Sequence, residues 1–439
     1  MRGITIRTYG IIIVVIVVVA AIGVGAWYVT KAPAVEKEIT IAWTEGPEFD
    51  FIESKLPEFE AATGITVNLE VIPRAHIVER LMLEIISPTG KIDGSVLYCT
   101  ELPTVAATAG LVNLYDYKPK SDWISEGFYQ SQLETVEIGG KLHIVPTLWN
   151  GALLLYYWEE YFENTEWKNE FMAWPGRTMP ELKVPENPEE LLEVAKFFHE
   201  KAPDKYAIHL QATTEEMGAG GYCLYPPLAA DFGGGVYNAD TGEILINKPE
   251  SVEAMEYLCE LVKYAQPTVL TDGTFEAQIA ILEGRCIMAD QWSYMVPMLN
   301  DPTQSKIPGK MKVAMRPFGQ MPDMLGIAIL NTPKKDLTWE FVEWTCSEEI
   351  VLGTTLACPK ASCRSDVAAN PQVSGSTWIN PILDSYGRVQ HICPLVKDPR
   401  IVEIYDAMMY HLGEAFTGAK TPQEACDAAA ADIQNIVKA

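Results

Sequence analysis

The sequence lacks the short patterns that identify most catalytic and cofactor sites. It contains no Gly-x-Ser-x-Gly elbow, no phosphate-binding Walker loop and no Cys-x-x-Cys pair. Its six histidines are scattered and form no His-Glu-x-x-His pair, so no metal ligands stand at a recognisable spacing. The sequence therefore predicts no metal site and no cofactor, and it does not predict an enzyme.

Positive charge is also scarce. The 439 residues include 33 Lys and Arg against 59 Asp and Glu, which gives a formal net charge of −26. Such a surface repels nucleic acids and anionic lipid headgroups, so we expect neither as a partner. The length is enough for about two or three domains of roughly 150 residues each.

The nine cysteines follow no recognisable motif. Cys358 and Cys363 flank a Pro-Lys-Ala-Ser turn and are the best local candidates for a disulfide, which the oxidising exterior of a cell would permit. Because the number is odd, at least one thiol stays free if every bridge lies within the chain. No cysteine stands near the end of the N-terminal apolar run, so the attachment used by bacterial lipoproteins is not expected.

One long apolar run is present, from Gly10 to Val29, and it carries no charge. A helix of about 20 residues spans the hydrocarbon core of a bilayer. Arg2 and Arg7 precede the run, which predicts a cytoplasmic N-terminus and an extracellular body at the cell membrane. We expect an uncleaved anchor followed by a tether that ends at Lys37. The alternative is a signal peptide, whose cleavage would release a secreted protein.

Beyond the tether, the spacing of apolar residues is that of a β-α-β unit. A short strand is expected over Ile39–Trp43, followed by a helix in which Leu56 and Phe59 share one face. Gly64 stands where a helix C-cap needs positive φ, and Ile65–Val71 then alternates between apolar and polar residues. This order of strand, helix, glycine and strand indicates an α/β domain.

Helices and strands continue to alternate along the chain, without an internal repeat. The ranges predicted for them are Val78–Ile86, Ile92–Tyr98, Leu102–Ala109, Leu111–Tyr117, Ala152–Tyr157, Asn187–Phe198, Ser251–Tyr264, Phe275–Glu283, Arg285–Trp292, Leu325–Leu330, Leu337–Cys346, Arg400–Phe416 and Pro422–Val437. The first four are expected as helix, strand, helix and strand, which is the order of a doubly wound sheet.

Several segments also occur in the order typical of a known family. After the opening strand they are PEFEAATGITVNLEVI, IDGSVLYCTELPTVAATAGLVNLYDY, GGKLHIVPTLWNGALLLYYW, PPLAADFGGG, AILEGRCIMADQW, MLGIAILNTPKK and GAKTPQEACDAA. Through them the chain from Glu38 to Ala439 resembles the family 1 extracellular solute-binding proteins, the maltose-binding-like components of ABC importers. It departs from their pattern at Tyr157, where asparagine is usual, and in its many cysteines.

The resemblance implies an α/β fold with two lobes, of the type II periplasmic-binding-protein kind, behind the N-terminal transmembrane helix. A cleft between lobes removes water from both sides of a ligand, and hinge closure converts occupancy into a change of shape. The expected divisions are anchor and tether over 1–37, first lobe over 38–146 plus 324–365, and second lobe over 147–323 plus 366–439.

A sugar presents hydroxyls and apolar ring faces, so its site needs aromatic side chains for stacking and carboxylates or amides for hydrogen bonds. Residues of these types stand at expected strand ends, at the first crossing between the lobes and in the second lobe. The residues predicted to bind ligand are Trp43, Glu45, Tyr98, Glu101, Trp149, Asn150, Tyr222, Tyr225, Trp292 and Tyr405. The assignment of Tyr405 follows from the resemblance, which places a stacking aromatic there.

The expected function is the extracellular capture of a mono- or oligosaccharide by a monomer that delivers it to the permease subunits of an ABC importer. One alternative keeps the fold but binds a cation such as a polyamine, since acids and aromatics also form cation sites. Another is a sensor that presents its ligand to a receptor. A membrane-anchored glycoside-acting enzyme would need two carboxylates at a defined separation, and Glu45 with Glu101 is one of many possible pairs.

Overall fold

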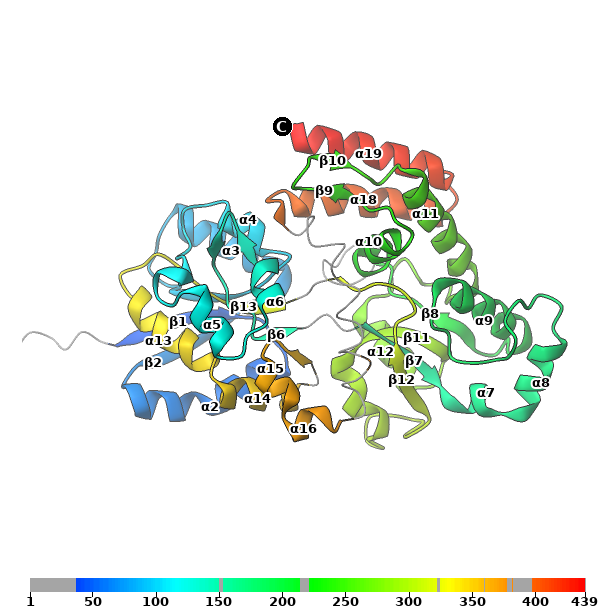
Figure 1. Ribbon diagram of the computed structural model, residues 1–439, viewed down its shortest axis with the longest axis horizontal. Helices are drawn as coiled ribbons and strands as arrows, with labels where there is room; N and C mark the ends of the chain where they lie inside the picture. Colours follow the sequence, from blue (N-terminus) through cyan, green and yellow to red (C-terminus); the bar gives the residue numbers. More distant parts are fainter. Residues whose placement is uncertain are drawn as a thin grey trace, which may run out of the picture.

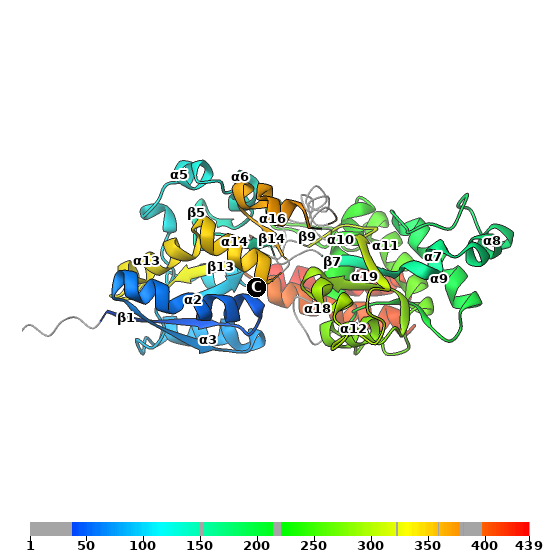
Figure 2. The ribbon, with the colours of Figure 1, turned by 90° about the horizontal axis from the view of Figure 1, so that it is seen from below.

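The computed structural model describes residues 37–438 apart from 150–152, 214–220, 322–323, 359, 377–380 and 382–396. They form two α/β lobes side by side along the long axis of the molecule (Figure 1), and the view from below shows the same division (Figure 2). The apolar run at 10–29 lies outside these residues. Within them, no helix is both long and apolar enough to cross a bilayer.

The first lobe is built on a six-stranded sheet with the order β14-β6-β13-β3-β1-β2. Its strands are β1 (Glu38–Trp43), β2 (Thr66–Val71), β3 (Gly94–Tyr98), β6 (Leu148–Trp149), β13 (Met324–Ile329) and β14 (Ala361–Ser362), and β4 (Glu137–Ile138) forms a separate hairpin with β5 (Lys141–Leu142). The first three strands are parallel, and β13 is antiparallel to β3, with Leu325 opposite Tyr98. The start of β13 therefore lies at the edge of the sheet where β1 and β3 end.

Helices cover both faces of this sheet. They are α2 (Pro47–Thr63), α3 (Arg74–Ile86), α4 (Leu102–Ala106), α5 (Lys120–Ser125), α6 (Gln130–Thr135), α13 (Lys335–Thr345), α14 (Glu348–Ala357), α15 (Ser365–Ala369) and α16 (Pro371–Ser374), with the 3-10 turn η1 (Leu114–Asp116). α2 packs against α13 and α14. Because β2 and β3 lie on opposite sides of β1, right-handed crossovers place α3 on the other face from α2 (Figure 1).

The second lobe is built on a four-stranded sheet with the order β12-β7-β11-β8. Its strands are β7 (Leu153–Trp158), β8 (Tyr206–His209), β11 (Cys286–Trp292) and β12 (Met311–Met315), and β9 (Tyr237–Asn238) pairs with β10 (Glu243–Ile244). β11 runs parallel to β8 and antiparallel to β7. Every residue of β11 is buried, so both faces of the sheet are covered.

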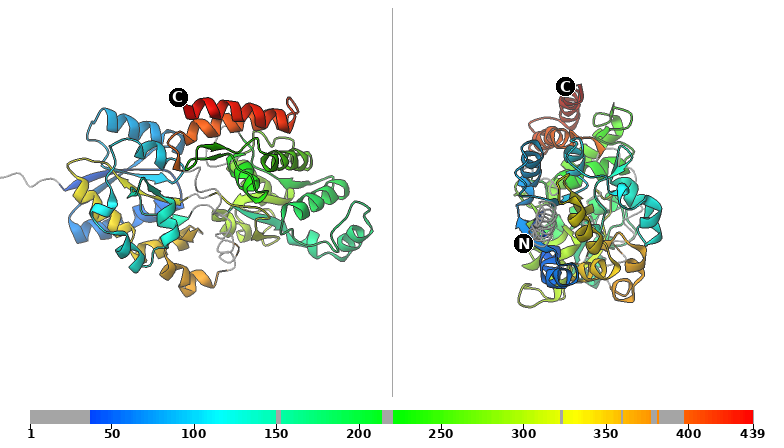
Figure 3. Two further views of the ribbon diagram at one scale, coloured as in Figure 1. Left: turned by 45° about the horizontal axis from the view of Figure 1, so that its top comes forward. Right: turned by 90° about the vertical axis from the view of Figure 1, so that its left-hand side faces the viewer.

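The helices of the second lobe include the C-terminal pair α18 and α19. They are α7 (Glu159–Glu163), α8 (Thr165–Ala173), α9 (Pro188–Lys201), α10 (Gly221–Asp231), α11 (Pro249–Leu261), α12 (Thr274–Leu282), α18 (Ile401–Phe416) and α19 (Pro422–Lys438), with the 3-10 turns η2 (Val262–Tyr264) and η3 (Ser293–Asn300). α18 and α19 pack side by side along one edge of the lobe (Figure 3), and the start of α18 reaches α4 of the first lobe, where Thr104 donates a hydrogen bond of 3.0 Å to the carbonyl of Pro399.

Two helix boundaries expected from the sequence are confirmed, one in the opening unit and one at α9. Gly64 has φ 69° and its N–H donates to the carbonyl of Glu60, which ends α2 as a glycine C-cap does. α9 begins after Asn187, whose side chain accepts a hydrogen bond from the N–H of Glu190. Both positions depend on chemistry within a few residues of the chain, so the sequence alone predicts them.

The strand predicted over 111–117 is wrong. Leu111 makes a single bridge to Leu330, and 114–116 forms the 3-10 turn η1. The side chain of Asn113 accepts hydrogen bonds from the N–H groups of Tyr115 and Leu142, at 3.3 and 3.1 Å. An asparagine that bonds the backbone in this way favours a turn over a continued strand.

Two boundaries and one disulfide also differ from expectation. β6, at 148–149, belongs to the first sheet, and α15 and α16 pack against α14, so the chain stays in the first lobe beyond 146 and beyond 365. Cys358 and Cys363 are both buried free thiols, and none of the cysteines in the described ranges forms a disulfide. Cys358 is the C-cap of α14 and Cys363 follows β14, so the two cysteines belong to separate elements. The short distance between them in the sequence did not reveal this.

We predict that Gly64→Val lowers the free energy of unfolding by about 1–2 kcal/mol, because a β-branched residue is strained at positive φ. Open space surrounds the position, so the effect reports backbone strain and not a clash. Urea denaturation measures it. Gly64→Asn is the matched control, since asparagine tolerates this conformation. Equal losses for the two variants would contradict the C-cap interpretation.

Candidate functional site

The candidate site of the first lobe lies at the edge of the sheet where β1 and β3 end. In doubly wound sheets, ligands bind outside the carboxyl ends of the strands. Trp43 is the last residue of β1 and Tyr98 the last residue of β3, and both side chains are almost fully buried. The chain leaves this edge for the second lobe after β6 and returns at β13. The predicted residues of the first lobe are thus beside the crossings.

Glu101 and Tyr98 are brought together by Arg74, the first residue of α3. Nε of its guanidinium lies 2.8 Å from Oε1 of Glu101, and Cζ lies 3.6 Å from the centroid of the Tyr98 ring. Oε2 of Glu101 accepts a hydrogen bond of 3.0 Å from the N–H of Tyr98. Both oxygens of this buried carboxylate are therefore engaged within the lobe, and one face of the Tyr98 ring is covered by a cation.

A second carboxylate, Glu48 in the first turn of α2, is paired with Lys360. Oε1 of Glu48 lies 3.1 Å from Nζ of Lys360, and both side chains are buried. Burial lowers the pKa of Lys360, but the neighbouring Cys358 and Glu48 raise it more, so that the pKa lies above its usual value and the ammonium keeps its charge. The pair joins α2 to a segment more than 300 residues later in the chain.

The third carboxylate belongs to the second lobe. Asp290 of β11 lies 2.7 Å from Nη2 of Arg316, just after β12, and both side chains are buried. Two residues further along β11, Trp292 is almost fully buried, and its carbonyl accepts a hydrogen bond of 2.7 Å from the hydroxyl of Tyr156. Asp290 and Trp292 therefore share a strand, and the carboxylate has its own internal cation.

The predicted tyrosines of the second lobe separate into two groups. The rings of Tyr222 and Tyr405 meet edge to face with centroids 4.2 Å apart. Burial raises the pKa of Tyr405, although a hydrogen bond with Tyr222 lowers it. Tyr405 lies in α18, which contacts α4 of the first lobe, so it stands near the boundary between the lobes. Tyr225 is buried like the other two, but its hydroxyl donates a hydrogen bond of 3.0 Å to the carbonyl of Ser251. Its hydroxyl is used in the core, so we remove Tyr225 from the candidate set.

The remaining predicted residues lie at the turn after β1 and at the first crossing. Glu45 is exposed between β1 and α2. The backbone of Trp149 pairs with Met324 and Ala361 in the first sheet, and its side chain is outside what the structure describes. Asn150 lies outside the described residues.

The sequence prediction missed Glu48 and the three cations Arg74, Lys360 and Arg316. Arg74 stands shortly after the predicted strand β2, behind Pro73, and it begins a helix. This position could have indicated a role at the strand end. Lys360 and Arg316 gave none, because each finds its carboxylate through the tertiary fold. The observed site differs from the predicted one chiefly because each buried carboxylate has a buried or half-buried lysine or arginine beside it.

Two lobes, each with aromatic and paired charged residues at the ends of its strands, define a protein that holds a solute between α/β domains. Residues 56–379 match the family model described as bacterial extracellular solute-binding protein. The chain belongs to this family, which implies an extracellular or periplasmic location for its body.

Relatives of known structure or curated description agree with this assignment. A maltotriose-binding protein of Pyrococcus abyssi is 22% identical over 344 residues. The match covers 76% of this chain and 65% of that relative, which is slightly under two thirds of its length. The maltose-bound MalE3 of T. maritima superposes with a TM-score of 0.74 at 18% identity, over 91% of this chain and 99% of the other. A Thermotoga lettingae solute-binding protein bound to α-D-tagatose gives 0.75 at 19%, with the same coverage.

We predict that Asp290→Asn lowers the free energy of unfolding by about 3–5 kcal/mol, because it removes the carboxylate that is hydrogen-bonded to the buried guanidinium of Arg316. Chemical denaturation measures the loss. The matched control is the double variant Asp290→Leu with Arg316→Met, which removes both charges and should recover most of the stability. A double variant as unstable as the single one would show that packing, and not the charge pair, carries the effect.

His209 at the end of β8 predicts a dependence of stability on pH. Its Nε2 lies 3.1 Å from Asp272, and burial lowers its pKa to about 4 although Asp272 and Glu276 raise it and Arg285 lowers it further. The unfolded chain binds the proton near pH 6.5, above the folded value, so stability is complete above that pH and falls as the pH drops toward 4.

We expect the contribution of His209 to this decline to be about 2–3 kcal/mol. Urea midpoints between pH 4 and 7 measure it, and His209→Gln should flatten that part of the profile. An unchanged profile in the variant would assign the decline to other groups.

Proposed function

We propose that this protein captures a neutral carbohydrate between its two lobes and delivers it to the permease subunits of an ABC importer. The observation that carries the proposal is charge balance at the strand ends. Glu101, Glu48 and Asp290 each have a cation of the same lobe at 2.8, 3.1 and 2.7 Å. A site whose buried acids are already neutralised presents aromatic surfaces and hydrogen-bonding groups, and the exposed Glu45 is the one carboxylate of the proposed ligand set outside these pairs.

The same observation disfavours a cationic ligand such as a polyamine. An ammonium would have to displace Lys360 or an arginine from a buried carboxylate, and leaving such a base unpaired is costly. A sugar needs no displacement, because its hydroxyls bond polar atoms and its ring faces stack on aromatics. The ligand in the name of one relative, maltotriose, and those bound to two others, maltose and tagatose, are neutral and polyhydroxylated.

The ligand residues proposed for this function are those at the strand ends and at the lobe boundary. They are Trp43, Glu45, Tyr98, Glu101, Trp149, Asn150, Tyr222, Trp292 and Tyr405. We propose that the protein acts as a monomer, that the apolar run at 10–29 anchors it to the membrane, and that it releases the sugar without chemical change.

A thermal-shift screen of residues 37–439 tests the ligand class. The probes are maltotriose, maltose, mannitol and tagatose, with spermidine as the cationic competitor. A ligand at 100 times its Kd stabilises the folded state by about 2.7 kcal/mol, so a true ligand gives a clear rise in Tm. We expect a rise with at least one sugar and none with spermidine. A rise with spermidine alone would overturn the proposal.

A further inference from the structure

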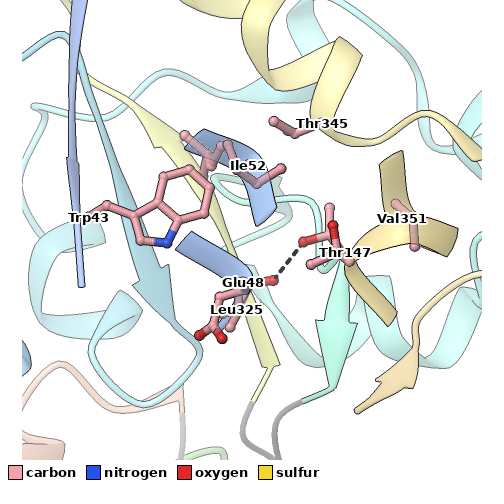
Figure 4. Close-up of a pocket in the computed structure, with 9 residues that line it drawn as sticks. Trp43, Glu48, Ile52, Thr147, Leu325, Thr345 and Val351 are labelled. Atoms are coloured by element: carbon pink, nitrogen blue, oxygen red, sulfur yellow. Dashed lines mark hydrogen bonds between the residues drawn. The ribbon is translucent and has the colours of Figure 1, made fainter. Parts of the chain in front are cut away.

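The two ends of the first sheet have different surroundings. At the end where β1 and β3 finish, Trp43, Glu48 and Leu325 line a small cavity (Figure 4). The end where β1 begins lies at the far end of the molecule, away from the second lobe (Figure 2). The part of the chain that contains the apolar run at 10–29 joins the body here, just before Lys37. This far end is therefore the part of the body that the chain holds nearest to the proposed anchor.

Asp93, just before β3, brings three segments together at the far end. Its carboxylate accepts hydrogen bonds of 3.0 Å from the N–H of Thr40 in β1 and of 3.0 Å from the hydroxyl of Thr332. It also lies 3.5 Å from Nζ of Lys334, the residue before α13. The short segment 87–91 connects α3 to the same strand. The end of α3 and the start of α13 thus lie at the end of the sheet where β1 begins.

The outward face of α3 changes its character toward the far end. His76, Glu79, Leu83 and Ile86 are exposed, and their spacing of three or four residues places them on one face of the helix. The first two are polar, whereas Leu83 and Ile86 are apolar and are 57% and 73% exposed. A helix face that meets only water is normally polar along its length. The apolar pair, Leu83 and Ile86, therefore indicates a partner at the far end.

Single apolar side chains on a surface need no explanation, but a pair on one helix face is less common. Among the residues that the structure describes, Ile86 is the most exposed large apolar residue. These residues hold one other exposed apolar pair at helical spacing, Phe275 and Ile279 of α12 in the second lobe. That second pair has the same chemistry but lies in the lobe that does not carry the tether, so it serves as a comparison.

Lysines accompany the apolar pair at the far end. Lys37, Lys91 and Lys335 are exposed there, and the acids next to them in the chain are the half-buried Glu38 and the exposed Asp336. The net charge of −26 predicts that the surface as a whole is repelled by anionic headgroups. The three lysines offset that repulsion locally, because basic side chains at a bilayer surface are attracted to the headgroup phosphates.

The tether limits how far the far end can stand from a bilayer. Residues 30–37 separate the apolar run from the body, and eight extended residues span at most about 28 Å. A tethered body meets its binding surface at a high effective concentration. A contact that is too weak to hold a free protein can therefore hold a tethered one, and two apolar side chains with three lysines form a contact of this size.

We propose that the far end of the first lobe rests on the surface of the lipid bilayer, with Leu83 and Ile86 in its interfacial layer and Lys37, Lys91 and Lys335 beside the headgroup phosphates. The inference rests on one part of the proposed function, because it requires the run at 10–29 to anchor the chain. The contact turns the opposite end of the sheet, which carries the candidate ligand residues, toward the surrounding medium.

Amine labelling of the full chain in vesicles tests the proposal. The vesicles contain four parts phosphatidylcholine and one part phosphatidylglycerol, the reagent is a membrane-impermeant N-hydroxysuccinimide ester, and mass spectrometry follows each lysine. Lys201 and Lys438, which are exposed in the second lobe, are the internal standards. Relative to them, Lys91 and Lys335 should be labelled at least about three-fold more slowly in the wild type than in the double variant Leu83→Gln with Ile86→Gln.

The matched control is the double variant Phe275→Gln with Ile279→Gln, which removes the exposed apolar pair of α12. Its Lys91 and Lys335 should be labelled as slowly as those of the wild type. Because both pairs are exposed, the Tm of each double variant should stay at the wild-type value, so that the comparison reports the membrane contact and not a change of fold.

Flotation of the vesicles in a density gradient separates the possible failures. A wild-type chain that does not float with the vesicles would overturn the proposed anchor and this inference with it. A chain that floats, but whose Lys91 and Lys335 react equally fast in the wild type and in the Leu83→Gln, Ile86→Gln variant, would overturn this inference alone. Slow labelling that disappears when the chain is diluted in excess lipid would show that a second copy covers the apolar pair, which also overturns the inference.

Discussion

The arrangement of the strand ends depends on the neutralisation of buried carboxylates within each lobe. Glu48, Glu101 and Asp290 all lie at least nine-tenths buried, and an isolated charge in such a place would destabilise the fold by several kcal/mol. Each is matched by Lys360, Arg74 or Arg316. A buried pair is weak evidence for net stability, but breaking one is strongly destabilising, so the three pairs fix where their elements can lie.

The pairs also determine what the strand ends can recognise. Arg74 begins α3 shortly after β2, and by engaging Glu101 and covering Tyr98 it fixes the loop between β3 and α4. Lys360 connects the segment before β14 to the first turn of α2. Since the cations are supplied from within each lobe, the three buried carboxylates leave no net charge for a ligand to satisfy.

The sequence predicts those features that depend on neighbouring residues. The β-α-β opening, the C-cap at Gly64, the start of a helix at Asn187 and the two-lobed family all follow from local spacing and from the order of segments. Features that depend on tertiary partners were missed or wrong. The segment 111–117 has the composition of a strand, but Asn113 turns it; Tyr225 has the residue type of a sugar site, but its hydroxyl bonds Ser251. No spacing in the chain indicates that Lys360 meets Glu48.

The most direct measurement for this account is a crystal structure of the protein with the ligand it captures. The account predicts a neutral sugar between the lobes, with the pairs of Glu48, Glu101 and Asp290 and their cations intact. A bound ammonium in place of Lys360 or one of the arginines would contradict it.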